Sequence, residues 1–252
     1  SVPMIHPDNL QLNEQLGQGA SGIIYKAHWV NKPQLYQHLP DDVAVKIFKG
    51  AITSDGYPAD ELDCCLTTGK HKSLIPAIGQ IHHGETLGLV MSLIPRGYQN
   101  LGLPPSLVTC TRDTFAAGTL FTLDAITHIA KQMADTLKHM HQQQISHGDI
   151  YAHNIMIDET FKVLFGDFGA ASNLSNLPNS QSQKMHRIEV RALGCLLEDL
   201  LGLILPENPE YHSEKYQQLT ALAFECMQDS SASRPDFSCL LKQLNTILPV
   251  YD

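Results

Sequence analysis

Two aspartates and an asparagine in the middle of the chain have the spacing that phosphoryl transfer from MgATP requires. Asp149 lies five residues before Asn154 in the run HGDIYAHN, and Asp167 follows in the run GDFG. A strand-like run, IMIDETFKVLF, separates the two motifs. Phosphoryl transfer needs a carboxylate that positions the acceptor hydroxyl and side chains that hold magnesium. The chemistry indicated by these residues also requires groups that bind the phosphates.

Candidates for the phosphate-binding groups occur upstream, in the required order. Residues 17–24 are GQGASGII, and residues 43–46 are VAVK, which ends at Lys46. A G-x-G-x-x-G pattern alone is weak evidence, because it also opens the helix of dinucleotide-binding units. Here the run IIYKAHWV follows, and its alternation of β-branched and aromatic residues indicates a strand. This context favours a glycine-rich loop that covers phosphates from a β-hairpin.

With these motifs in order, the chain resembles the protein-kinase superfamily. Its HGDxYAHN and GDFGAAS segments are most similar to bacterial kinase domains associated with leucine-rich repeats. The resemblance covers nearly the whole chain, since EVRALGC at 189–195 resembles the D-V-W-S-L-G segment of the large lobe and Arg234-Pro235 resembles the late arginine of the family. It implies an α+β, two-lobed protein-kinase-like fold, with a small β-rich N-lobe carrying one main helix and a larger, mainly helical C-lobe. It also implies a single catalytic domain over residues 1–252, with an N-lobe over about 1–91, a hinge over about 92–95 and a C-lobe over about 96–252.

The resemblance implies that the chain uses ATP and Mg²⁺, and it assigns roles to the matching residues. Asp149 orients the acceptor hydroxyl, Asn154 and Asp167 hold magnesium, and Lys46 binds the α- and β-phosphates. His147 is implied to be structural, without a part in proton transfer. Met91 is implied to be the gatekeeper beside the purine. The complete set implied to bind ATP is Gly17, Gly19, Gly22, Ile24, Ala44, Lys46, Met91, Ser92, Ile94 and Met156.

Local patterns predict the elements of the N-lobe. A helix is expected over about 58–69, with Pro58 in its first turn and Gly69 at its end. Glu61 on this helix is implied to pair with Lys46, and Asp60 is a neighbouring candidate. Both carboxylates also fit an exposed first turn, which the helix dipole favours. Five strands are expected near residues 10–16, 23–29, 43–48, 78–83 and 87–92.

The second part of the chain is predicted to be mainly helical. Residues 96–120 are rich in Pro, Gly, Ser and Thr and predict an irregular excursion. Thr122 is expected to cap a helix that runs to about 143, whose histidines are interpreted as surface or packing residues. Three closing helices are expected from Glu189 onward. The predicted core stripe of the first helix consists of Leu123, Ile126, Ile129, Ala130, Met133, Leu137 and Met140.

Several departures from the family pattern bear on activity. Gly148 replaces the arginine that precedes the catalytic aspartate, so we expect activity without phosphorylation of the activation loop. Tyr151 stands where serine/threonine kinases have lysine, and His153 where tyrosine kinases have arginine. No A-P-E triplet occurs between Gly169 and Glu189, so the peptide-docking platform is expected to be truncated. Glu189 replaces an aspartate that bonds the catalytic-loop amides. The usual partner of Arg234 is then absent, and we expect that arginine to bind another carboxylate or to be exposed.

Composition agrees with a catalytic domain and excludes some functions. The net charge of −9 argues against nucleic-acid or anionic-membrane partners. The cysteines are scattered without a CxxC pair, which favours free thiols in a cytoplasmic protein over zinc or disulfides. No apolar run approaches the ~20 residues of a membrane span. The chain begins at Ser1 rather than Met, so we expect a domain of a longer protein, to which leucine-rich repeats are a candidate addition.

Three functions compete at this point. The leading hypothesis is an ATP- and Mg-dependent protein kinase that phosphorylates a protein of unknown identity, with Ser or Thr preferred as acceptor. A small-molecule phosphotransferase is favoured by the missing A-P-E platform. A nucleotide-binding pseudokinase scaffold is favoured by Gly148, Tyr151 and Glu189.

Overall fold

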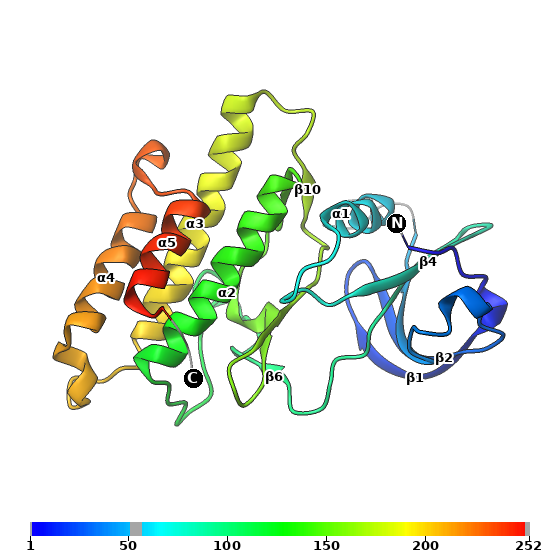
Figure 1. Ribbon diagram of the computed structural model, residues 1–252, viewed down its shortest axis with the longest axis horizontal. Helices are drawn as coiled ribbons and strands as arrows, with labels where there is room; N and C mark the ends of the chain where they lie inside the picture. The colour runs from blue at the N-terminus through cyan, green and yellow to red at the C-terminus, as the bar shows by residue number, and fades with distance from the viewer. Residues whose placement is uncertain (1, 51–56, 250–252) are drawn as a thin grey trace. The chain divides into compact units, whose positions relative to one another are not determined.

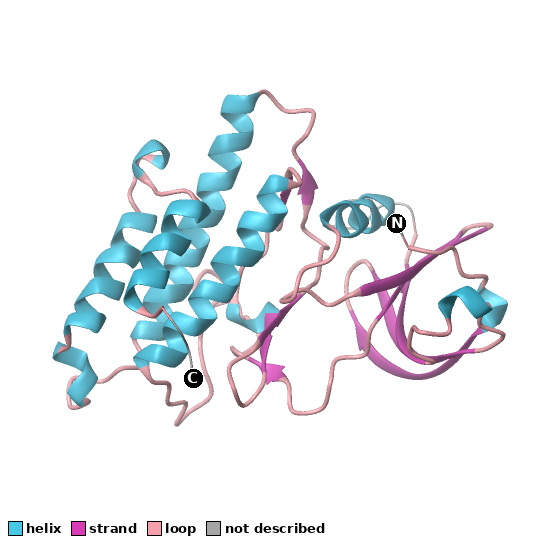
Figure 2. Cartoon of the chain, in the orientation of Figure 1, coloured by secondary structure: helices cyan, strands magenta, loops and turns pink. Residues whose placement is uncertain are grey.

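The computed structural model describes residues 2–50 and 57–249 (Figure 1). The ends of the predicted domain, at residues 1 and 250–252, lie outside the described residues. The chain forms two compact units, the first over 1–96 with 167–172 and the second over 97–166 with 173–252. The first contains a sheet and one α-helix, and the second is mainly helical (Figure 2). The predicted α+β class, with a β-rich part followed by a mainly helical part, is confirmed.

The first unit is built on a five-stranded sheet in the order β1-β2-β3-β5-β4, in which all neighbours are antiparallel. The helix α1 spans Pro58–Thr68 and begins with a proline in its first turn, as predicted. The five predicted strands are all present within two residues of their expected bounds. They are β1 (Leu10–Gln18), β2 (Gly22–Trp29), β3 (Asp42–Phe48), β4 (Ala77–His83) and β5 (Thr86–Met91).

The two faces of this sheet have different characters. One face carries the apolar core of the unit, which includes Ala27, Val43, Val45 and Val90. Side chains alternate between faces along a strand, and directly paired residues share a face. The pairings Ile24↔Lys46 and Ala44↔Met91 therefore place these four residues together on the opposite face. Register alone thus separates the hydrophobic core from the predicted nucleotide-binding residues.

Four helices form the main body of the second unit. They are α2 (Leu123–Gln142), α3 (Asn179–Leu201), α4 (Glu214–Cys226) and α5 (Phe237–Ile247). α2 packs against α3 and α5, and α4 packs against α3 (Figure 2). The Thr122 side chain accepts a hydrogen bond from Ala125 N–H, which confirms the predicted cap of α2. All seven residues of the predicted core stripe are buried.

One helix boundary was predicted wrongly. α3 begins at Asn179, ten residues before the expected start at Glu189. The first half of α3 is NSQSQKMHRI, which has no apolar stripe to indicate a helix. Tertiary contact stabilises it instead, because the buried Ser182 hydroxyl donates to the Leu174 carbonyl. The segment between Gly169 and α3 is consequently even shorter than the sequence suggested.

Short elements connect the helices. Residues 96–120 are largely irregular, as predicted, except for β6 (Gln99–Asn100), which pairs antiparallel with β8 (Ile155–Ile157). β8 continues the small sheet to β9 (Val163–Phe165). The remaining elements are β7 (Ile145–Ser146), β10 (Ser172–Asn173) and 3₁₀ turns at Pro7–Asn9, Gln34–Tyr36, Ala152–Asn154, Pro209–His212 and Ser231–Ser233.

Across residues 2–50 and 57–249, no helix has the length and apolarity needed to cross a membrane. The six cysteines are free thiols in the structure. Burial raises the pKa of Cys64 to about 11 and that of Cys226 to about 12, so both are protonated at neutral pH.

Candidate active site

A buried ion pair joins β3 to α1 in the first unit. The Lys46 ammonium donates to Glu61 Oε2 at 2.6 Å, and both side chains are buried. Asp60, the neighbouring candidate, is exposed. Glu61 Oε1 is also buried and has no hydrogen-bond partner among the described residues. The fold thus fixes the Lys46 ammonium on the face of the sheet that carries Ile24, Ala44 and Met91.

The glycine-rich loop is the turn between β1 and β2. Gly19 N–H donates to the Gly22 carbonyl at 3.0 Å, which closes the hairpin. A Cβ at Gly22 would lie 2.4 Å from the Ile47 carbonyl oxygen, so β3 packing excludes any side chain there. A Cβ at Gly17 or Gly19 would meet no atom within 4 Å. These two glycines therefore border open space in which backbone can approach a ligand.

The GDFG segment belongs to the first unit from Asp167 onward. Asp167 is exposed and has a φ of 56°, a conformation that costs free energy for a residue with a Cβ. Its Oδ1 accepts the Gly169 N–H at 3.1 Å, whereas Phe168 is buried. A Cβ at Gly169 would lie 3.2 Å from Glu61 Oε1. The GDFG segment therefore lies close to the Glu61 carboxylate on α1.

The residues implied to bind adenine are distributed between the two units. In the first unit, Met91 ends β5, and Ser92 N–H donates to the Pro76 carbonyl at 3.0 Å. Ile94 is exposed just beyond. Met156 is half-buried on β8 and belongs to the second unit.

In the second unit, Asn154 holds the carboxylate of Asp149. Asn154 Nδ2 donates to Asp149 Oδ2 at 2.7 Å and to the Asp149 carbonyl at 2.9 Å. Both partners can only accept, so the orientation of the amide is fixed by chemistry. Its Oδ1 then has no donor among the described residues and is available to a metal ion.

The residues that precede Asp149 are held by the backbone. His147 is fully buried, its Nδ1 accepts Asp149 N–H at 3.1 Å, and its Nε2 donates to the Gly166 carbonyl at 2.8 Å. Its ring stacks on Phe165, with centroids 4.1 Å apart. Both ring nitrogens are therefore engaged, in agreement with a structural role. Gly148 has a φ of 85°, which an arginine at this position would adopt only with strain.

Glu189 on α3 reaches the catalytic-loop amides despite being longer than the family's aspartate. Its carboxylate accepts from His147 N–H and Gly148 N–H, both at 2.9 Å, and from His141 Nε2 at 2.8 Å. Burial opposes ionisation of Glu189, but the hydrogen bonds from His141 and Gly148 outweigh it, so the pKa is lowered. His141 was interpreted only as a surface or packing histidine. No local pattern indicates its contact with a residue 48 positions away.

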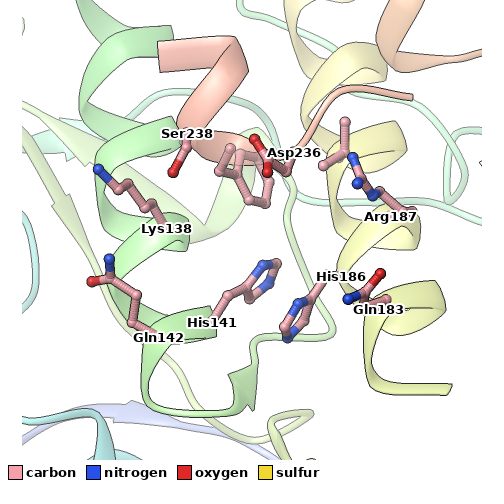
Figure 3. Close-up of a pocket in the computed structure, with 10 residues that line it drawn as sticks. Lys138, His141, Gln142, Gln183, His186, Arg187, Asp236 and Ser238 are labelled. Carbon is pink, nitrogen blue, oxygen red and sulfur yellow. The ribbon is translucent and has the colours of Figure 1, made fainter. Parts of the chain in front are cut away.

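A cavity of about 260 Å³ lies behind this network, between α2, α3 and the start of α5 (Figure 3). His141 stacks on His186 from α3 with centroids 4.0 Å apart. Burial, and next the neighbouring His141, lower the pKa of His186 to about 4, so its ring is neutral at physiological pH. The cavity is lined by Lys138, His141, Gln142, Gln183, His186, Arg187, Val190, Asp236, Phe237 and Ser238.

The expectation for Arg234 was wrong. The side chain is buried, and its guanidinium donates to backbone carbonyls at Arg187 and Gln228 instead of a carboxylate. Arg187 in turn donates to the Arg234 carbonyl at 2.6 Å. The Gln228 carbonyl lies just beyond the end of α4, where carbonyls lack a helical partner, and the Arg187 carbonyl within α3 has a second lone pair, so both can accept from a guanidinium without an ion pair.

Each unit by itself offers groups of the kind that MgATP needs: Lys46 and Asp167 lie in the first unit, and Asp149 and Asn154 lie in the second. Asp149, Asn154 and Asp167 offer oxygen ligands, which magnesium prefers, and Lys46 offers a cation for phosphate. Within residues 2–50 and 57–249, no group of three or more His, Cys, Asp or Glu could hold a metal ion. A site with few protein ligands suits magnesium, which completes its coordination with substrate phosphates and water.

Comparison with known proteins matches residues 10–199 to the family described as "Protein tyrosine and serine/threonine kinase". The chain is 29% identical to the Angiopoietin-1 receptor of Danio rerio over 174 residues, which cover 66% of this chain and 15% of the receptor. It is 23% identical to Fibroblast growth factor receptor 1 of Xenopus laevis over 287 residues, covering 96% of this chain and 35% of the receptor. It is 24% identical to an Activated Cdc42 kinase-like protein of Drosophila melanogaster over 172 residues, which cover 68% of this chain and 12% of that protein.

The chain thus spans about a third or less of the length of these relatives. The likeness to bacterial kinases with leucine-rich repeats stays a prediction. The family match covers three quarters of the chain and includes the glycine-rich loop, the Lys46–Glu61 pair, the catalytic loop and the GDFG segment. The chain therefore belongs to the family of protein tyrosine and serine/threonine kinases.

Proposed function

We propose that this domain transfers the γ-phosphoryl group of ATP to a hydroxyl of a protein, with Ser or Thr preferred and without need of activation-loop phosphorylation. The observation that carries the proposal is the Asp149–Asn154 pair, which positions a carboxylate and leaves an amide oxygen available for metal. A pseudokinase has no need to preserve this geometry. Bound MgATP would supply the phosphoryl group and the metal charge.

The roles of the residues follow from charge and position. The Lys46 ammonium, held by Glu61, is placed to bind the α- and β-phosphates, and the open side of Gly17 and Gly19 admits the β- and γ-phosphates. Asp149 orients the acceptor hydroxyl. Because the transition state is anionic, fixed cations and backbone N–H groups contribute most of the acceleration.

The preference for Ser or Thr is supported by the residues that follow Asp149. The ring of Tyr151 stacks on His153, with centroids 5.6 Å apart and an interplanar angle of 16°. Burial, then the nearby charges of Asp149 and Asp113, raise the pKa of Tyr151, so its hydroxyl is neutral. This aromatic pair adds bulk beside the catalytic carboxylate and favours a small acceptor side chain. Matched peptides that differ only in Ser, Thr or Tyr test the preference, and a higher kcat/KM for Tyr would overturn it.

Independence from activation-loop phosphorylation is supported by Gly148, which offers no cation to a phosphate. Aspartate substitutions at the exposed Ser172, Ser175 and Ser180 are expected to leave kcat/KM within about twofold of wild type. Ser182 is a poor candidate for modification, because it is buried on α3. A strong rise in activity in any exposed-site variant would contradict the proposal.

The decisive experiment compares wild type, Asp149→Asn and the exposed control Glu159→Gln. Each is incubated with γ-labelled ATP and magnesium in a lysate of the source cell, and nucleotide binding is measured in parallel. We expect labelled protein with wild type and Glu159→Gln, and loss of label with Asp149→Asn while nucleotide is still bound. Label only in small molecules would favour a small-molecule phosphotransferase. Nucleotide binding without any transfer would favour a pseudokinase.

We propose a cytoplasmic location, on the basis of the scattered free cysteines. A fusion to leucine-rich repeats is proposed only from the likeness of the HGDxYAHN and GDFGAAS segments.

A further inference from the structure

The irregular segment 101–119 is attached firmly to the catalytic loop, although the sequence indicated no role for it. Leu101 N–H donates to the Ile155 carbonyl at 2.8 Å, and Gly102 N–H donates to the Ala152 carbonyl at 3.0 Å. In the opposite direction, Ala152 N–H donates to Asp113 Oδ1 at 2.7 Å. The loop that carries Asp149 and Asn154 thus both accepts hydrogen bonds from this segment and donates one to it.

A second set of contacts ties the same segment to α3. The Arg112 guanidinium donates to both carboxylate oxygens of Asp199 and, at 2.6 Å, to Glu198. Asp199 also accepts the Asp113 N–H at 3.0 Å. Planar, bidentate pairs of this kind fix orientation as well as distance. Hydrogen bonds therefore connect segment 101–119 both to the catalytic loop and to α3 within the second unit.

A cavity of about 270 Å³ lies between these three elements. Gly148, Ile150 and Tyr151 line it, and they flank Asp149 in the chain. Residues 170–178, the short remnant of the activation segment, contribute nothing to its lining. The other lining residues are Thr111, Asp113, Ser146, Met185, Ile188, Glu189, Arg191, Ala192, Cys195 and Asp199. The cavity in Figure 3, by contrast, contains no residue of the catalytic loop.

Four of the residues that line the cavity are apolar. Ile150, Met185, Ile188 and Ala192 contribute aliphatic or thioether groups, and Ile188 is 55% exposed in the middle of a helix. Pockets for drug-sized ligands occupy about 300–1,000 Å³, so this cavity is better matched to a single side chain. Segment 101–119 also presents Leu107 and Val108, which are 101% and 92% exposed. Exposed apolar side chains of this kind are a feature of surfaces that bind other polypeptides.

The carboxylates that line the cavity have hydrogen-bond partners, whereas its arginine has no carboxylate partner. Asp199 is held by Arg112, Glu189 by the loop amides, and Asp113 by Ala152 N–H. Arg191 is exposed, and the only hydrogen bond of its guanidinium to the described residues is a 3.9 Å contact with Cys195 Sγ. The cavity therefore keeps one cation whose charge no neighbouring carboxylate neutralises through an ion pair.

We propose that segment 101–119 and α3 replace the missing A-P-E platform, and that their cavity receives an apolar side chain next to the acceptor hydroxyl of a protein substrate. Arg191 binds an acidic residue adjacent to that side chain. This inference rests on the proposed protein kinase activity and names the class of its substrate: an extended peptide with an apolar and an acidic residue near the phosphorylated position.

The test uses a peptide library with a fixed acceptor, in which one flanking position at a time is varied, and γ-labelled ATP. Wild type is expected to select Leu, Ile, Met or Phe at one flanking position and Asp or Glu beside it. Ile188→Glu should lower kcat/KM for the selected peptide at least about tenfold, mainly through KM. Arg191→Glu should reverse the charge preference from acidic to basic. Phe224→Glu, at an exposed apolar site on α4, is the matched control and should change neither preference.

The outcomes separate this inference from the proposed function. Flat positional preferences in wild type, or preferences that Ile188→Glu and Arg191→Glu leave unchanged, would overturn the inference while protein phosphorylation stands. Failure of wild type to phosphorylate any peptide or lysate protein would overturn both. Because Ile188 and Arg191 are exposed, their replacement by glutamate, a good helix former, is not expected to unfold α3.

Discussion

Replacing Glu189 by alanine is expected to destabilise the second unit and to impair catalysis together. The substitution removes the acceptor of His147 N–H, Gly148 N–H and His141 Nε2. His147 and His141 are buried, so their donors would lack a partner, whereas the exposed Gly148 N–H can turn to water. Each unpaired buried donor costs about 1–3 kcal/mol, so the loss of two should lower the free energy of unfolding by about 2–6 kcal/mol. A shift of the loop by ~1 Å would lower kcat about a hundredfold.

Denaturation by urea, monitored by fluorescence, and peptide kinetics measure the two effects. Glu225→Ala, at an exposed position on α4, is the matched control and should change stability by less than about 0.5 kcal/mol. If Glu189→Ala does not fold, Glu189→Gln keeps one acceptor oxygen and should lose about half as much stability. Equal unfolding midpoints for Glu189→Ala and Glu225→Ala would refute the reasoning.

The same network predicts a dependence on pH. The pKa of Glu189 in the folded protein is below the ordinary value of 4.5, so the unfolded state binds the proton more readily. The stability that the carboxylate contributes is therefore fully present above pH about 4.5 and is lost as pH falls through the folded pKa. The difference in stability between wild type and Glu189→Gln should narrow in that acidic range.

Three further predictions concern other contacts. Lys46→Met should abolish phosphoryl transfer. It should also lower the free energy of unfolding by about 3–5 kcal/mol, because the Glu61 carboxylate is left buried without a cation. Adding Glu61→Leu should restore the stability measured in urea but not the activity. Folding lowers the pKa of His186 from 6.5 to about 4, so the protein should lose stability as pH drops through that range, by at most about 2 kcal/mol because solvent screens the half-buried ring. His186→Phe should remove this slope, and identical slopes would count against a neutral ring. Arg112→Ala should release segment 101–119 from Asp199 and speed its cleavage in limited proteolysis, whereas Arg112→Lys should restore protection only in part, because lysine cannot form the bidentate pair.

The elements that carry strong local patterns were predicted well. β2 alternates β-branched and aromatic residues with others, and α2 has both a threonine cap and an apolar stripe. The first half of α3 has neither, because its residues gain stability from contacts made after folding, such as Ser182 with Leu174. The same reason explains Arg234, whose backbone partners at Arg187 and Gln228 have no signature in the sequence.

The sequence by itself determined the chemistry of this protein. Asp149 and Asn154 are five residues apart, so a short turn suffices to bring their side chains together, and Gly19 and Gly22 are close enough in sequence to close a hairpin by a local hydrogen bond. Only the tertiary structure decided that Glu61 rather than Asp60 meets Lys46. It also decided that Glu189 and segment 101–119 both bind backbone N–H groups of the catalytic loop. These contacts join residues about 15 to 42 positions apart, and their geometry depends on how helices and strands pack, which no local pattern of residues encodes.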